Sequence, residues 1–168
     1  FGTFSQTVKP LDDYLGPEMR ANMDRILGRD MEILGKFRHS LDGNWKLYME
    51  NVRDTYHATL LHSFFPTFGL VRLSMKGGIV MSDGGLHHMT YSMRATDQAE
   101  SQYNAKDLRA VKDGYTLNAP ELIEGWPEYE CGTTLAIQSI FPNFSVQQLS
   151  NVITVRLNVP KGPDKSEL

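Results

Sequence analysis

The feature that most constrains the fold of this chain is a change of pattern near Pro66. Before it, apolar residues recur at three- and four-residue steps, as on the buried face of a helix. Beyond it, short runs rich in β-branched and aromatic residues alternate with turn residues. Strand runs joined by short turns, with a long helix before them, favour an α+β domain in which a curved antiparallel sheet grips the helix.

Two helices and one strand are expected before this change. Residues 11–27 place apolar side chains at helical offsets and are followed by Gly28, which predicts a surface helix covering a sheet. Residues 43–62 repeat the pattern from Trp45 onward and predict one long helix. Between them, residues 30–41 (DMEILGKFRHSL) alternate from Met31 and pass through Gly35, which predicts a strand with a bend or bulge.

The second half of the chain is expected to supply the sheet. Residues 69–95 predict two strands joined through Asp83-Gly84-Gly85, and residues 101–126 predict a polar helix followed by a loop. Residues 133–160 predict further strands, broken at Pro142-Asn143 and near Ser150-Asn151.

Length and charge exclude several classes of protein. A chain of 168 residues with 40% hydrophobic content fits one globular domain. A net charge of -3, with no run of Lys or Arg, argues against a nucleic-acid partner. No apolar run approaches the roughly 20 residues that cross a bilayer, and the first residues lack the layout of a secretory signal. We expect a soluble, cytoplasmic protein with no membrane partner.

The segment Glu50–His62, with the sequence ENVRDTYHATLLH, places three ionisable side chains at fixed offsets among apolar ones. Asp54 and His57 are three positions apart, so on a helix they lie on one face and can touch. His57 and His62 are five apart, which is roughly 140° around an ideal helix. For both imidazoles to bind one ion, the helix must be widened or broken between them.

Two neutral imidazoles and a carboxylate that leave adjacent positions open form the facial triad that holds non-haem Fe(II) for oxygen chemistry. Imidazole also suits Zn, Cu and Ni, so the two histidines do not select the metal. The offset disfavours the zinc-protease motif, whose histidines stand four apart and enclose a Glu. Cys131 is the only cysteine, so a metal here rests on imidazole and oxygen. A lone histidine is more often a hydrogen-bonded core residue, whereas the pair beside Asp54 favours a metal site.

Three further features are candidates for the site. Arg156 lies inside an apolar strand run, where its guanidinium either clamps a substrate carboxylate in a bidentate way or points outward from the sheet. His87 and His88 are adjacent, so on a strand they point to opposite faces and only one can line a pocket. Apolar side chains near the histidines either wall a cavity or belong to the ordinary core: Val52, Ala58, Leu60, Leu61, Phe64 and Phe65.

Residues 43–78, GNWKLYMENVRDTYHATLLHSFFPTFGLVRLSMKGG, resemble the large (alpha) subunit of the Rieske non-haem iron aromatic ring-hydroxylating oxygenases. The family signature is an Asn-Trp-Lys-Leu stretch leading to Glu-Asn, then Asp, His and His. The resemblance extends through PLDDYLGPE, GGLHHMTYSM and SIFPNFSVQQLSNVITVRLNVP, so it covers most of the chain. Within the family, the chain is most similar to the terephthalate, salicylate and anthranilate oxygenase branch.

The resemblance implies a role for each residue of the motif. His57 and His62 would be iron ligands, and Asp54 would be the bridge by which electrons arrive from a Rieske cluster on a neighbouring subunit. Asn51 would be a further catalytic position. The third ligand, an aspartate that follows a further helix, is expected beyond Leu168. None of the aspartates between His62 and Leu168 sits in a matching context: Asp83, Asp97, Asp107, Asp113 and Asp164.

The resemblance also implies the architecture and the reaction. Residues 1–168 would be part of a single helix-grip, Bet v 1-like catalytic domain, incomplete at both ends, with a Rieske [2Fe-2S] domain upstream and C-terminal helices downstream. The oxygenase would hydroxylate an aromatic carboxylate with O2 at a mononuclear Fe(II), using electrons from NAD(P)H through a reductase or ferredoxin. A homotrimer or an α3β3 assembly would bring cluster and iron together across a subunit boundary.

Two alternatives from other classes remain. One is a non-catalytic helix-grip domain that binds a hydrophobic ligand, with His57 and His62 as core residues. The other is a zinc-dependent hydrolase, which would hold zinc and need no electron donor.

Overall fold

The computed structural model describes residues 2–68, 75–93, 112, 114–120, 128–129 and 131–168. The helical elements are α1 (Leu11–Leu15), α2 (Pro17–Leu27), α3 (Trp45–Arg53), α4 (His57–Leu61), α5 (Phe64–Thr67) and the short 3-10 helix η1 (Asp83–Gly85). The strands are β1 (Ser40–Leu41), β2 (Gly77–Met81), β3 (His88–Met93), β4 (Thr133–Ile140), β5 (Phe144–Leu149), β6 (Val152–Leu157), β7 (Val159–Gly162) and β8 (Lys165–Glu167).

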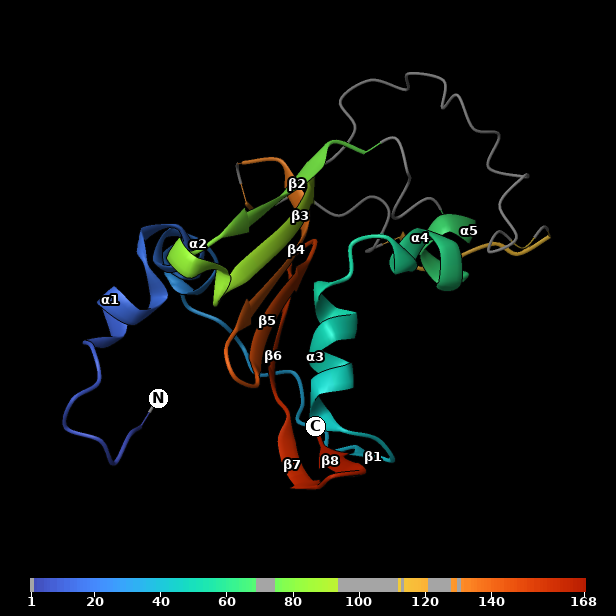
Figure 1. The fold of residues 1–168 in the computed structure, drawn as a ribbon. Coiled ribbons are helices and arrows are strands. Elements are labelled where there is room, and N and C mark those ends of the chain that lie inside the picture. The colour runs from blue at the N-terminus through green and yellow to red at the C-terminus, as the bar shows by residue number, and fades with distance from the viewer. Residues whose placement is uncertain (1, 69–74, 94–111, 113, 121–127, 130) are drawn as a thin grey trace.

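A five-stranded antiparallel sheet is the centre of the fold. Its strands follow the chain in the order β2-β3-β4-β5-β6, and a smaller sheet has the order β1-β8-β7. The large sheet is curved, with α2 on one side and α3 on the other (Figure 1). The predicted α+β class with a curved antiparallel sheet is therefore confirmed.

The face under α2 is packed as a core. Leu15 and Met19 bury against Ile140 of β4, and a second cluster joins Ile26 to Val146 of β5. A buried hydrogen bond links the amides of Asn22 and Gln138, and Gln138 Nε2 also donates to the carbonyl oxygen of Met19 (2.9 Å). Even-numbered residues of β4 therefore point towards α2, since side chains alternate along a strand.

The helix predicted at residues 11–27 covers the sheet as expected, but it is two helices. Gly16 lies between them with φ of +78°, a left-handed conformation that glycine adopts without the penalty of a Cβ. Pro17 then begins α2, where its missing N–H is not needed and its fixed φ suits the helix.

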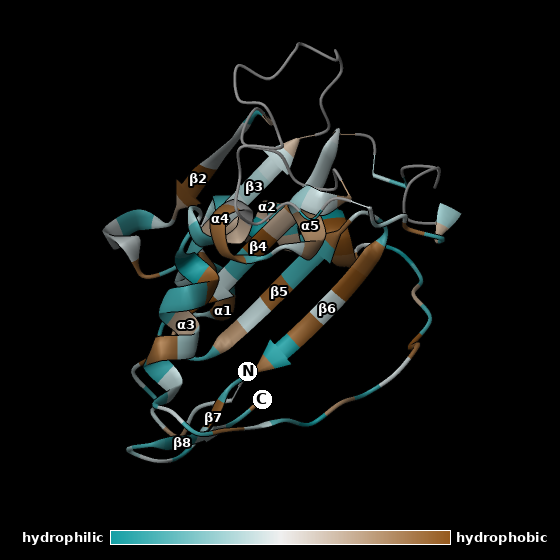
Figure 2. Ribbon diagram, turned by 90° about the vertical axis from the view of Figure 1, so that its right-hand side faces the viewer, coloured by the Kyte–Doolittle hydropathy of each residue, from teal (hydrophilic) through white to brown (hydrophobic). Residues whose placement is uncertain are grey.

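The opposite face of the sheet carries α3, α4 and α5 (Figure 2). The side chain of Asn44 caps α3 by accepting a hydrogen bond from the backbone N–H of Lys46 (3.0 Å). Met49 and Val52 are the buried residues of this helix, which contacts β3 and β4. The predicted long helix over residues 43–62 is wrong in its length, because α3 ends at Arg53 and α4 begins at His57.

The strand predicted over residues 30–41 is present only as β1 at its end (Ser40–Leu41), and residues 31–37 form no strand. This stretch runs without a strand partner, and Ile33, Leu34 and Phe37 are 89%, 82% and 82% exposed. Alternation alone gives no strand unless a neighbour offers backbone groups to pair with, and pairing here begins only at β1, which pairs with β8.

The other strand predictions can be compared where the chain is described. β2 and β3 form a hairpin through Asp83-Gly84-Gly85, and β4, β5 and β6 are separated at the two predicted turns. Residues 69–74 and 94–95, and most of the predicted helix at residues 101–126, lie outside the described residues. Of the helices in the described ranges, none has the length and hydrophobicity that a membrane span requires.

Candidate functional site

The turn that follows α3 is built around Asp54. Its backbone closes the helix, and its carboxylate Oδ1 accepts a hydrogen bond from the backbone N–H of Tyr56 (2.8 Å). An aspartate that bonds the backbone two residues ahead offers an alternative to the next helical turn. The helix therefore stops here, although the apolar spacing continues.

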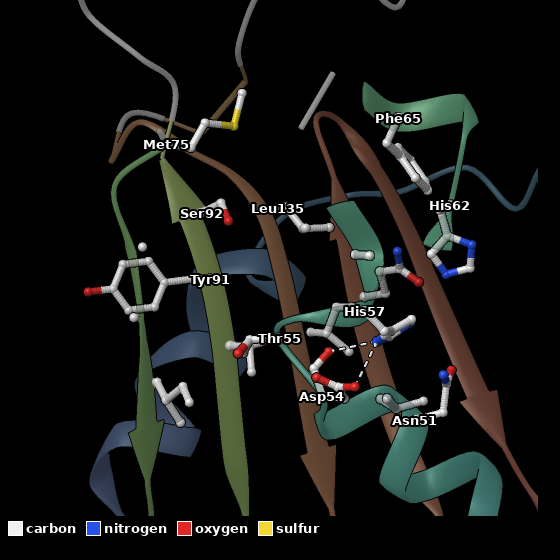
Figure 3. Close-up of a pocket in the computed structure, with 18 of the residues that line it drawn as sticks. Asn51, Asp54, Thr55, His57, His62, Phe65, Met75, Tyr91, Ser92 and Leu135 are labelled. Carbon is white, nitrogen blue, oxygen red and sulfur yellow. Dashed lines mark hydrogen bonds and ion pairs between the residues drawn. The ribbon is translucent and has the colours of Figure 1, made fainter. Parts of the chain in front are cut away.

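This turn brings Asp54 and His57 into contact, as their spacing predicted. His57 Nδ1 lies 2.9 Å from the backbone oxygen of Asp54 and 3.7 Å from its carboxylate Oδ2 (Figure 3). Because a carbonyl oxygen only accepts hydrogen bonds, Nδ1 carries the proton. Nε2 then keeps its lone pair, which is the form of imidazole that binds a metal.

His62 meets His57 from the other end of α4. His62 follows the last residue of this five-residue helix and has left helical geometry, with ψ of 106°. The two imidazole ring centroids are 5.0 Å apart, with planes at 66°. The predicted break between the histidines is present, because α4 ends at Leu61 and His62 has left helical geometry; the helix is also interrupted before His57.

A cavity of about 630 Å3 lies between these residues and the sheet. Figure 3 shows Asp54, His57 and His62 on its helical side, and Ser92 and Leu135 on its strand side. Its volume falls within the range usual for small-molecule sites. The lining residues are Tyr48, Asn51, Val52, Asp54, Thr55, His57, Ala58, His62, Phe65, Met75, Gly77, Gly78, Ile79, Thr90, Tyr91, Ser92, Leu135, Ile137, Gln147 and Arg156.

Most of the predicted site residues lie around this cavity. Asn51, Val52, Ala58 and Arg156 all line it, and Arg156 is the one Arg or Lys among the described lining residues. Leu61 differs from the expectation, because it is 76% exposed and is not among the described lining residues. Leu60 and Phe64 are likewise exposed, whereas Phe65 belongs to the wall.

The strand residues that form the floor of the cavity were not predicted from the sequence. Thr90, Ile137 and Gln147 are aligned across β3, β4 and β5, so they share the face that looks towards α3. Ser92 lies two residues further along β3 on the same face. Pairing the strands in register would have revealed these residues, but no local motif marks them.

The donor set fits one part of an iron site. His57 presents Nε2, its ring is held through Nδ1, and His62 lies beside it. The backbone oxygen of Asp54 holds Nδ1, while the Asp54 carboxylate accepts the Tyr56 N–H and lies 3.7 Å from the same nitrogen. Over the described ranges, no group of three or more His, Cys, Asp or Glu is arranged to hold a metal. A further ligand is therefore required.

His87 and His88 point to opposite faces, as predicted, and both are buried. His87 lies between α1 and β4: its Nε2 is 2.9 Å from the Tyr14 carbonyl oxygen, and its Nδ1 accepts the Phe141 N–H (3.1 Å). His88 faces the side of α3. Neither histidine is among the described residues that line the cavity.

Acid is expected to destabilise the fold through His88. Burial, and secondly the charge of Arg53, lower the pKa of His88 to about 4. In the unfolded chain, His88 takes up a proton near pH 6.5, whereas the folded chain resists this protonation until the pH is near 4. The contribution of His88 to the unfolding free energy is therefore complete above pH 6.5 and is lost as the pH falls towards 4. The expected loss is about 3 kcal/mol of unfolding free energy, and burial lowers the pKa of His87 in the same direction.

Urea denaturation between pH 7 and pH 5 measures this effect. His88→Gln is expected to show a shallower fall in unfolding free energy than wild type, and the exposed His39→Gln is the control. Equal pH dependence in wild type and His88→Gln would contradict the prediction.

Comparison with known proteins identifies the family. Residues 28–168 match the family described as ring hydroxylating alpha subunit (catalytic domain). Over 168 residues, the chain is 46% identical to terephthalate 1,2-dioxygenase, terminal oxygenase component subunit alpha 2, from Comamonas sp, covering 100% of this chain and 41% of that protein.

Two further relatives have similar names. The chain is 41% identical to the anthranilate 1,2-dioxygenase large subunit from Burkholderia cepacia, covering 100% of this chain and 40% of that protein. It is 34% identical to the salicylate 5-hydroxylase large oxygenase component from Ralstonia sp, covering 96% of this chain and 38% of that protein. The chain thus spans about two fifths of the length of these relatives. On the extent of these matches, the chain belongs to the family of ring-hydroxylating oxygenase alpha subunits, within their catalytic domain.

Proposed function

We propose that this chain forms the iron-binding part of an oxygenase that hydroxylates the ring of an aromatic carboxylate. The observation that carries the proposal is the Asp54, His57 and His62 arrangement at the wall of a cavity suited to a small molecule. The α+β fold and the family membership of the chain agree with this proposal. In this proposal residues 1–168 are one part of a single catalytic domain, in a cytoplasmic protein.

His57 and His62 would hold the metal, and a carboxylate from beyond Leu168 would complete the ligand set. A mononuclear Fe(II) bound there supplies O2 activation. Electrons would come from NAD(P)H through a reductase or ferredoxin, and then through a [2Fe-2S] Rieske cluster in a domain upstream of residue 1. The support for iron over zinc is the family membership, because imidazole ligands alone suit both metals.

Asp54 would connect the two metal centres. Its backbone oxygen accepts the Nδ1 proton of His57, and its carboxylate lies close to the same nitrogen. A carboxylate next to a ligating imidazole fixes the ring and raises its basicity. The Asp54 side chain is 49% exposed, so a neighbouring subunit can reach it. This exposure supports a homotrimer or an α3β3 assembly in which the cluster of one subunit serves the iron of the next.

An aromatic carboxylate suits the rest of the cavity. Arg156 offers a planar guanidinium to a carboxylate, while Val52, Ala58 and Phe65 offer apolar surface to a ring. The names of the three relatives above each contain an aromatic acid: terephthalate, anthranilate or salicylate. Asn51 lies beside Asp54 on the wall and is proposed as a further catalytic position.

One alternative draws on a specific observation. The described residues contain a cavity with apolar walls but no complete metal-binding group, which is what a non-catalytic hydrophobic-ligand-binding domain would show. In that case His57 and His62 would be structural.

Metal analysis with Fe(II) titration of the full-length polypeptide separates these functions. We expect the double variant His57→Ala, His62→Ala to lose one mononuclear iron per subunit and to retain the cluster iron, because imidazole ligands are removed from one site only. The exposed His39→Ala serves as the control and should keep all its iron. Equal iron in wild type and the double variant would make the histidines structural and favour the binding domain, and bound zinc would favour a hydrolase.

A further inference from the structure

A row of small polar residues crosses the sheet beneath α3. His88 is directly opposite Ser139, and Ser139 is directly opposite Ser145, on the adjacent strands β3, β4 and β5. Opposite residues in an antiparallel sheet share a face. Gln138, next to Ser139, points to α2, so this row looks the other way, towards α3.

The polar atoms of this row are buried without partners in the described chain. They are both ring nitrogens of His88 and the hydroxyl oxygens of Ser139 and Ser145, in residues only 6%, 0% and 1% exposed. Nε of Arg53, in the last turn of α3, is a fifth such atom. Buried polar groups in folded proteins nearly always have a hydrogen-bond partner, so these five together require one.

Their chemistry indicates what the partner is. Arg53 Nε is a donor, a neutral imidazole has one donor and one acceptor, and each hydroxyl can do both. A mixed set of donors and acceptors suits water, whereas an anion would satisfy only the donors. Side chains directly opposite in a sheet have Cβ atoms about 5 Å apart, so the polar atoms of neighbouring members of the row are within reach of one bridging water.

Arg53 connects this row to the functional site. Its Nη2 donates to the carbonyl oxygen of Leu86 (3.3 Å), two residues before His88, so the guanidinium lies at the entry to β3. Its charge acts on His88, where it adds to the lowering of the pKa by burial. Arg53 directly precedes Asp54, so a fixed Arg53 side chain fixes the end of α3 from which the Asp54 turn begins.

We propose that His88, Ser139 and Ser145 bind ordered water that accepts the Nε proton of Arg53, and that His88 is thereby a positioning residue for Asp54. The effect on turnover rests on the proposed oxygenase function. The binding of water does not rest on that function, because it is inferred from the buried polar atoms alone.

A crystal structure of the full-length protein, at a resolution that shows ordered water, tests the first part. We expect a water within hydrogen-bond distance of Arg53 Nε that also contacts His88 or Ser139. The absence of ordered water next to His88, Ser139 and Ser145, or a direct hydrogen bond between Arg53 and His88, would overturn the proposed binding of water. This result does not depend on whether the protein is an oxygenase.

A double-variant cycle tests the positioning role. His88→Leu and Arg53→Lys are each expected to slow turnover about 10-fold with bound iron and substrate KM unchanged, and His88→Gln is expected to restore most of the rate. If both act through the same water, the double variant is no slower than the slower single variant, since coupled residues are not additive. Rates that multiply, or iron lost in step with turnover, would overturn the role.

Serine variants keep the test informative if His88→Leu does not fold. Ser139→Ala removes one hydroxyl of the row and is expected to slow turnover with iron unchanged. Ser166→Ala is its matched control, because that hydroxyl is also buried and unpartnered in the described chain but lies on β8 of the small sheet. Equal rates for the two variants would overturn the proposal. If wild type holds no mononuclear iron, the proposed function fails, and the same cycle measured on unfolding free energy still tests the water.

Discussion

Asp54→Asn in the full-length enzyme is expected to lower turnover by about 100-fold while leaving substrate affinity and bound iron near their wild-type values. The amide has the shape of the carboxylate, and its oxygen can still accept the Tyr56 N–H that forms the turn. The backbone oxygen that holds His57 Nδ1 is unchanged. What is lost is the negative charge that the proposed function places between the iron and the Rieske cluster. Asp54→Ala also removes the turn acceptor, so it is expected to abolish turnover.

Three measurements on the same preparations check this expectation: steady-state product formation, substrate binding at equilibrium, and iron content. Asp83→Asn is the matched control, because Asp83 is an exposed turn aspartate between β2 and β3, away from the histidines. Normal turnover in Asp54→Asn would exclude the bridging role. Loss of iron together with turnover would instead make Asp54 a ligand.

The strands that could be predicted are those with strong local turn signals. The β2–β3 hairpin turns through Gly84 and Gly85, whose φ values of +75° and +69° favour glycine, and these residues are visible in the sequence as Asp-Gly-Gly. The alternation at residues 31–37 looked equally regular, but no strand of the described residues pairs with it. Pairing is a property of the whole fold, so the local pattern could not reveal its absence.

The spacing of Asp54, His57 and His62 predicted the candidate site, but it did not predict the geometry of these residues. The apolar period that begins at Trp45 continues to Tyr56, and it predicted one helix. A hydrophobic period carries no information on whether an aspartate side chain will bond the backbone ahead of it, which is what ends α3. The close approach of the two imidazoles depends on a second interruption, the end of α4 before His62.

The residues that line the cavity also differ in whether the sequence alone could predict them. Arg156 was predicted because a charge inside an apolar strand run is conspicuous in the sequence. Gln147 and Ser92 are ordinary polar residues, and only the strand register places them on the face towards α3. The alignment of His88 with Ser139 and Ser145 likewise follows from the strand register and is not a sequence motif.

Arg156→Met is expected to weaken binding of an aromatic carboxylate by about 100-fold, the usual cost of removing a hydrogen-bonded partner of a charged group. Methionine keeps much of the apolar stem and removes the guanidinium, which is the one Arg or Lys side chain among the described lining residues. Arg156→Lys restores the charge but not the planar pair of donors, so an intermediate affinity is expected.

The matched primary amide of the same acid separates charge recognition from a damaged cavity. It keeps the ring and nearly the same shape but has no negative charge, so wild type and Arg156→Met are expected to bind it with similar affinity. Equilibrium dissociation constants for acid and amide, measured on wild type and both variants, give the comparison. A large loss for acid and amide alike would mean that Arg156 shapes the cavity, and no loss for the acid would place its carboxylate elsewhere. Because Arg156 lies on the sheet and the histidines lie on the helical side, a carboxylate bound to Arg156 would direct the ring towards His57 and His62.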